Sequence, residues 1–150
     1  MTNKLPGKQL KRYHYWKIGQ INIQSCSDDL RLDLALKECV RANLEIICLQ
    51  EVRRLNTGAL YHLGYNFYWS GLSRQRKYGV GIAVKKTSDI IIESIHNTNC
   101  RVMAVDVTVR GCKLRIVSCY APVLKTPLST KQTFYAIWLE YPRQKNPGKS

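Results

Sequence analysis

Acidic residues are scarce in this 150-residue chain. Asp and Glu total 10 against 24 Lys and Arg, which gives a net charge of +14. Such an excess is typical of proteins that bind polyanions, because Lys and Arg release counterions from phosphates on contact. A basic surface without a specific partner explains the charge equally well. The charge therefore raises nucleic-acid binding as a hypothesis and does not decide it.

Long apolar runs are also missing. No stretch approaches the roughly 18 residues that a membrane-spanning helix needs. The start of the chain is basic and has no apolar stretch before Trp16, unlike a secretory signal. We therefore expect an intracellular protein without membrane contact, with the nucleus as one compartment open to it. At 45% hydrophobic residues, the composition is that of a folded protein rather than a disordered one.

The six cysteines include no Cys-x-x-Cys pair, which excludes a zinc ribbon and a thioredoxin-type site. Cys39, Cys48 and Cys119 lie inside apolar stretches. Six reduced thiols are the simplest interpretation, and they agree with an intracellular chain.

The chain length predicts one domain with two polar ends. Residues 1–14 are basic and polar, and we expect a flexible arm there. Residues 15–141 carry the hydrophobic patterns of a domain. Residues 142–150 are rich in Lys, Asn, Pro and Gly, which predicts a disordered tail.

The first part of the domain has a strand–helix–strand pattern. Residues 17–23 alternate between apolar and polar, as a strand does. A helix capped by Ser27 follows and ends near Asn43, and residues 46–49 form a short apolar run typical of a buried strand. A right-handed crossover makes the two strands parallel. Their ends, at Asn22 and Glu51, then lie at one edge of the sheet, where open α/β sheets bind ligands.

The second part is rich in strands. Arg110–Gly111 fits a hairpin turn, and Gly79 and Gly81 fit a close backbone approach within a strand better than a phosphate loop. A last helix is predicted over residues 133–140. The predicted strands are 65–70, 79–84, 89–94, 102–109 and 113–120.

Three polar residues stand at predicted strand ends. A carboxylate such as Glu51 after an apolar strand needs a partner or a cation, and hard cations such as Mg²⁺ prefer carboxylate oxygens. Taken alone, an exposed strand end is the simpler interpretation of Glu51, and a turn residue that of Asn22. Tyr120 could orient a phosphate or be a core tyrosine before Pro122.

A basic segment surrounds one aromatic residue. Arg74, Arg76 and Lys77 directly precede Tyr78, a pattern typical of a surface that binds nucleic acid by charge and stacking. A solvent-exposed hairpin is an equal alternative.

The order of these elements is more informative than any one of them. A strand ends in Ile-Asn22-Ile, another in Leu-Gln-Glu51, and a later strand runs into Tyr120-Ala-Pro122. This series, over about residues 17 to 140, resembles the endonuclease/exonuclease/phosphatase superfamily. Within it, the sequence is most similar to the endonuclease domains of LINE-type (non-LTR) retrotransposons and to craniofacial development protein 2-like proteins.

The resemblance implies an α/β fold, the N-terminal portion of a two-sheet, DNase I-like α/β sandwich with helices outside. It also implies hydrolysis of phosphodiester bonds with Mg²⁺ or Mn²⁺, and DNA as the partner. Asn22, Glu51 and Tyr120 match the family's catalytic asparagine, metal-binding glutamate and active-site tyrosine.

The sequence departs from the family pattern in its last third. The family continues with an Asp-x-Asn and an Asp-His pair, but here no Asp follows Asp106 and no His follows His96. We therefore expect a DNA endonuclease domain truncated before these motifs and inactive as it stands. The alternative is a non-catalytic, basic remnant of a retrotransposon that binds nucleic acid or another protein. Truncation would leave a sheet face uncovered, so self-association is also expected.

Overall fold

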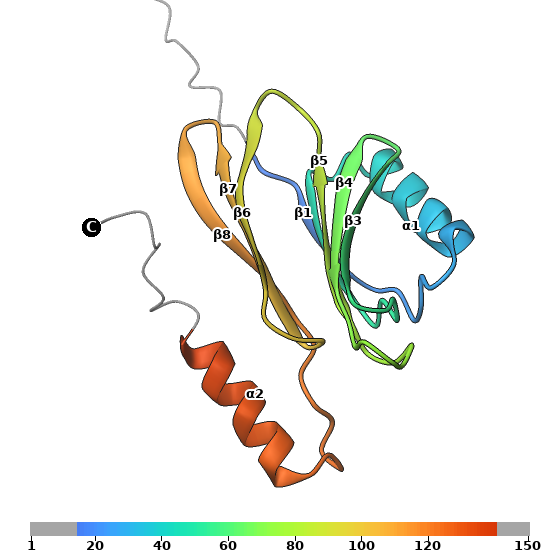
Figure 1. Ribbon diagram of the computed structural model, residues 1–150. Coiled ribbons are helices and arrows are strands. Elements are labelled where there is room, and N and C mark those ends of the chain that lie inside the picture. Colours follow the sequence, from blue (N-terminus) through green and yellow to red (C-terminus); the bar gives the residue numbers. More distant parts are fainter. Residues whose placement is uncertain (1–14, 141–150) are drawn as a thin grey trace, which may run out of the picture.

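The computed structural model describes residues 15–140, so the predictions for residues 1–14 and 142–150 lie outside the described residues. Strands and helices alternate only at the start of the chain, as the sequence predicts (Figure 1). The elements in chain order are β1 (Ile18–Asn22), α1 (Asp29–Arg41), β2 (Ile46–Gln50), β3 (Thr57–His62), β4 (Tyr65–Ser70), β5 (Val80–Lys85), β6 (Ile90–Asn97), β7 (Val102–Val109), β8 (Cys112–Cys119) and α2 (Leu128–Glu140).

The strands form two sheets. The larger sheet has the order β1-β2-β5-β4-β3, and the smaller has the order β6-β7-β8. β1 and β2 are parallel, with Asn22 opposite Gln50, whereas all other neighbouring strands are antiparallel. The predicted parallel pair is thus confirmed, because a helical crossover separates its two strands.

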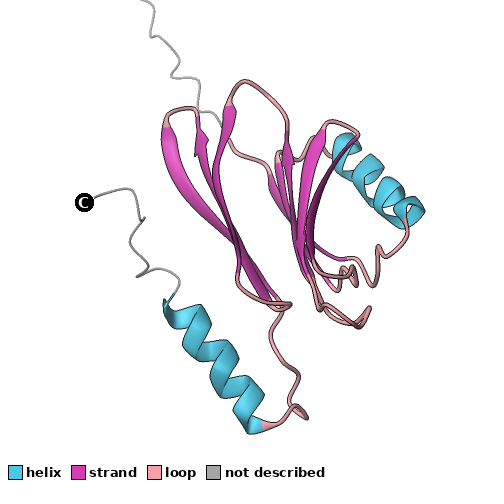
Figure 2. Ribbon diagram, in the orientation of Figure 1, coloured by secondary structure: helices cyan, strands magenta, loops and turns pink. Residues whose placement is uncertain are grey.

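The sheets pack face to face, with a helix outside each (Figure 2). The apolar face of α1, with Leu32 and Leu36, covers the outer face of the larger sheet. Phe134 of α2 packs on Val102 and Ala104 at the outer face of the smaller sheet. Between the sheets, the buried residues are Ile46, Val80, Ile82, Val84, Ile90, Met103, Val105, Val107 and Val109. The fold is the two-sheet α/β sandwich that the sequence predicts.

Both helices begin at other residues than the sequence pattern suggests. Asp28, not Ser27, caps α1, since its Oδ1 accepts a hydrogen bond of 2.9 Å from the Arg31 amide. Ser27 instead lies 3.1 Å from the hydroxyl of Ser25. α2 begins at Leu128, because the carbonyl of Pro127 already accepts the first helical hydrogen bonds.

The turns follow the prediction more closely. Arg110 (φ 47°) and Gly111 (φ 82°) both have left-handed backbone, as a tight hairpin turn between β7 and β8 requires. A Cβ on Gly81 would lie 2.7 Å from the Phe67 ring, which confirms a close approach within a strand.

All six cysteines are free. Cys26 and Cys39 are buried, Cys112 is exposed, and burial raises the pKa of Cys48 to about 11. Within residues 15–140, neither helix has the length and apolar character to cross a membrane.

Candidate active site

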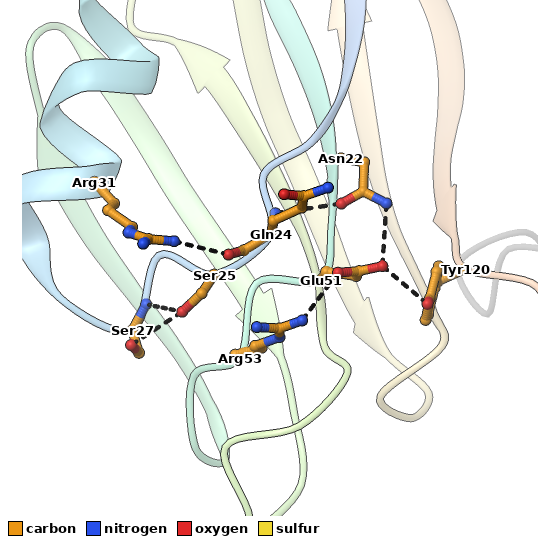
Figure 3. A network of polar contacts seen from close by, with 8 residues as sticks. All are labelled: Asn22, Gln24, Ser25, Ser27, Arg31, Glu51, Arg53 and Tyr120. Atoms are coloured by element: carbon orange, nitrogen blue, oxygen red, sulfur yellow. Dashed lines mark hydrogen bonds and ion pairs between the residues drawn. The ribbon is translucent and has the colours of Figure 1, made fainter.

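Three strand ends meet at one edge of the sandwich. β1 ends at Asn22, and Glu51 directly follows β2 beside it. Tyr120 directly follows β8 of the other sheet. Because the sheets pack face to face, the tyrosine reaches across to the carboxylate (Figure 3).

The side chain of Glu51 is the centre of this meeting point. The Asn22 amide donates to Glu51 Oε1 at 3.2 Å, and the Tyr120 hydroxyl donates to the same oxygen at 3.0 Å. Arg53 Nη2 donates to Oε2 at 3.1 Å. The structure thus brings together the three residues that the sequence singles out, while their catalytic roles stay predictions.

The contacts move the pKa values of the carboxyl and the phenol apart. The hydrogen bond from Asn22, followed by those from Tyr120 and Arg53, lowers the pKa of Glu51 below its ordinary value. Burial, and then the hydrogen bond to Glu51, raises the pKa of Tyr120. Near neutral pH, Glu51 is therefore an anion and Tyr120 a neutral donor.

The loops around the carboxylate have unusual backbone. Glu51 (φ 54°), Arg53 (φ 56°), Gln24 (φ 51°) and Ser25 (φ 94°) all lie in the left-handed region. Such conformations are unfavourable for non-glycine residues and concentrate at functional sites. Hydrogen bonds between the loops maintain them, including one of 2.8 Å from the Ser25 amide to the Glu51 carbonyl.

The Asn22 amide has a defined orientation. Its Oδ1 accepts from the Gln24 backbone amide at 3.2 Å, which leaves Nδ2 facing Glu51 (Figure 3). Asn22 therefore acts on the carboxylate as a donor.

Sequence reasoning missed Arg101, which lies beside the same site. Its guanidinium lies 4.5 Å from the ring centre of Tyr78 and 5.4 Å from that of Tyr120. Nη1 donates to the Tyr120 carbonyl at 3.2 Å. Arg101 is nearly buried, and no carboxylate of residues 15–140 forms an ion pair with it. Nothing in its sequence context distinguished it from other basic residues.

The predicted basic segment lies between β4 and β5. Lys77 Nζ lies 4.9 Å from the ring centre of Tyr78, and the rings of Tyr78 and Tyr120 are 6.4 Å apart. Tyr78 thereby joins the basic segment to the site. Arg74 and Arg76 are exposed on the same loop.

The free positions on Glu51 suit a hard cation. A carboxylate offers about four lone-pair positions, and Oε1 already accepts two hydrogen bonds, whereas Oε2 accepts one. Residues 15–140 contain no cluster of three or more His, Cys, Asp or Glu that could enclose a metal. A single carboxylate still fits Mg²⁺, which keeps several waters and commonly uses one or two carboxylates plus substrate phosphates.

Comparison with known proteins agrees with this geometry. The model of the Endonuclease/Exonuclease/phosphatase family matches residues 19–148. The chain belongs to this family. Membership confirms the fold predicted from the sequence and indicates a hydrolase of the nuclease or phosphodiesterase kind, in a family whose members typically depend on divalent metals.

One curated relative is the "Craniofacial development protein 2" of Bos taurus. It is 26% identical over 121 residues, which cover 81% of this chain and 20% of the relative. The chain thus spans about a fifth of the length of the curated relative it matches.

Proposed function

We propose that Asn22, Glu51 and Tyr120 form the metal- and phosphate-binding part of a DNA endonuclease site. The observation that carries this proposal is the convergence of two neutral donors on Glu51 Oε1. They hold an ionised carboxylate in place and leave room on Oε2 for Mg²⁺ or Mn²⁺. A divalent cation bound there would neutralise charge on a phosphate oxygen and polarise the phosphorus.

The neighbouring residues supply the rest of phosphate binding. The Tyr120 hydroxyl can turn from Glu51 to a phosphate oxygen, since an ionised carboxylate is not its only suitable acceptor. Arg101 adds a fixed positive charge that no described carboxylate neutralises. Charge of this kind stabilises a phosphodiester as negative charge develops on its oxygens.

DNA is the proposed substrate class. The net charge of +14 favours a polyanion, and Lys77 and Tyr78 offer charge and a stacking surface beside the site. Arg74 and Arg76 extend the basic surface along the loop. Nuclear location and a retrotransposon origin stay predictions.

A second candidate is binding without cleavage. No Asp follows Asp106 and no His follows His96 in the sequence, so groups matching the family's Asp-x-Asn and Asp-His are absent from these 150 residues. Loss of general-base catalysis typically slows a reaction by about 10²- to 10⁴-fold. Under this second candidate, residues 1–150 bind metal and DNA without measurable cleavage.

Calorimetric titration with Mn²⁺ tests the metal site. Glu51→Gln keeps the size of the side chain and removes its charge, so the dissociation constant should rise by about tenfold or more. Glu38→Gln is the matched control, because Glu38 is exposed on α1 and pairs only with Arg41 among the described residues. Equal Mn²⁺ affinity of wild type and Glu51→Gln would contradict the proposal.

Nicking of supercoiled plasmid separates the two candidates. Mg²⁺-dependent nicking that disappears in Glu51→Gln supports the endonuclease. DNA binding that weakens with salt, with no nicking by either protein, supports the binding candidate.

A further inference from the structure

Two buried polar side chains lie directly behind the site. Gln50 is the last residue of β2 and precedes Glu51, and it is 5% exposed. Ser118 lies in β8, two residues before Tyr120, and is fully buried. The two residues belong to different sheets, so any bond between them joins the sheets.

A directed chain of hydrogen bonds runs through this pair. Gln50 Nε2 donates to Ser118 Oγ at 3.3 Å, and Ser118 Oγ donates to the Leu49 carbonyl at 3.1 Å. The direction is fixed, because the hydroxyl gives its single proton to Leu49 and can then only accept from the amide. β8 is thereby tied to the end of β2 at two atoms.

Stability alone does not explain this pair. Gln50 Oε1 is buried and has no hydrogen-bond partner among the described residues, and an unpartnered buried acceptor is unfavourable. An apolar side chain of similar volume would avoid that penalty, and Ser118 Oγ would still donate to the Leu49 carbonyl. The glutamine therefore points to a role in geometry.

We propose that Gln50 and Ser118 are positioning residues that hold β8 against β2 and so keep the Tyr120 hydroxyl on Glu51. The hydrogen bond between Tyr120 and Glu51, 3.0 Å long, spans the two sheets one residue beyond Gln50 and two beyond Ser118. A slip of about 1 Å between the strand ends would break it, because hydrogen bonds weaken steeply beyond their normal range. The consequence for metal binding rests on the proposed function of Glu51.

Mn²⁺ titration of Gln50 and Ser118 variants is the first test. Gln50→Met and Ser118→Ala should each raise the Mn²⁺ dissociation constant by about tenfold, as lost support of a metal ligand does. The double variant should bind no more weakly than the weaker single variant, because both break one connection. The melting temperature of Gln50→Met should equal or exceed that of the wild type. Wild-type affinity in Gln50→Met would overturn the inference.

Ser70→Ala is the matched control. Ser70 is also a buried serine whose hydroxyl donates to a backbone carbonyl, that of Asn99, at 2.8 Å. Among residues 15–140, its hydroxyl has no hydrogen bond to β2 or β8, so its removal should leave Mn²⁺ affinity unchanged. Equal losses of affinity in Ser70→Ala and Ser118→Ala would mean general loosening and would overturn the inference.

A second readout needs no metal. In protein with ¹³C-labelled tyrosine, the ring resonances of Tyr120 should shift in Gln50→Met and Ser118→Ala. Those of Tyr65, whose hydroxyl donates to the Leu44 carbonyl, should stay in place. If wild-type protein bound no Mn²⁺, the proposed function would fail, and this spectrum would still decide the inference. Unmoved Tyr120 resonances would overturn it.

Discussion

The carboxylates of Asp106 and Glu51 differ in how many polar groups surround them. Asp106 accepts from Arg115 Nε at 2.6 Å and Nη2 at 2.9 Å, and from Ser94 at 2.9 Å. His96 Nε2 lies 2.9 Å from Asp106 and 3.2 Å from the Ser94 hydroxyl. Because the same ring nitrogen faces both groups, the imidazole cannot relay a proton between them through its two nitrogens. Four polar contacts reach the Asp106 carboxylate, whereas three reach that of Glu51, so Glu51 keeps more room for a cation.

The contacts of Asp106 predict acid-sensitive stability. Its pKa is held well below the ordinary value, chiefly by Arg115, so its contribution is present above about pH 4 and is lost as the pH falls further. Asp106→Asn should lower the free energy of unfolding at pH 7 by about 3 kcal/mol, since Arg115 then faces a neutral amide in place of a carboxylate. In urea titrations the difference from wild type should shrink by pH 2.5. A difference that stays constant down to that pH would contradict this account.

For single residues, the sequence could locate the side chains at strand ends but not the contacts that they make. Asn22 and Glu51 were predictable neighbours because parallel strands end at one edge. The approach of Tyr120 depends on how the sheets pack, and only the family resemblance indicated it. Arg53 and Arg101 were missed, because no local pattern marks which arginine of a basic chain reaches a site.

At the scale of the elements, hydrophobic alternation predicted most strands. It missed β3 (Thr57–His62), whose residues include a glycine and few β-branched side chains. β3 is stabilised by its pairing with β4. Gly58 pairs with Trp69 of β4, whose ring occupies the space where a Cβ on Gly58 would lie. Such cross-strand packing cannot be derived from one strand's own sequence.

The cap of α1 gives a prediction at this scale. Asp28→Ala should lower the free energy of unfolding by about 1 kcal/mol, because the Arg31 amide loses its acceptor. Ser27→Ala is the control and should change it by less than about 0.5 kcal/mol. Chemical denaturation of both variants measures the two effects. A larger loss of unfolding free energy in Ser27→Ala than in Asp28→Ala would identify Ser27 as the N-cap.

At the scale of the whole molecule, the packing of the two sheets brings the ends of the parallel strands β1 and β2 beside the end of β8 in the opposite sheet. The fold class, with its two packed sheets, followed from the order of motifs through the family resemblance, whereas the start of α2 did not. Charge is the other property of the whole chain. The excess of basic residues attracts phosphates in general. The loop before Tyr78 places part of this positive charge beside the site.

That charge predicts a measurable salt dependence. Replacing Arg74, Arg76 and Lys77 together by Gln should weaken binding to duplex DNA at low salt. The slope of log K against log salt should become less steep by about 2 to 3, since each lost phosphate contact removes about 0.9. Fluorescence anisotropy over a series of salt concentrations measures it. Replacing Lys85, the last residue of β5, and the following Lys86 serves as the charge control. An equal change in slope per charge removed would contradict a specific role of the loop in DNA binding.

The proposed function depends on cation binding by Glu51. Paramagnetic broadening of NMR signals by trace Mn²⁺ tests it most directly, because the effect falls steeply with distance from the ion. The signals of the Asn22 side-chain amide and the Tyr120 ring should broaden first, whereas those of His96 and Ser94 around Asp106 should persist. Broadening centred on another carboxylate, or none near Glu51, would contradict it.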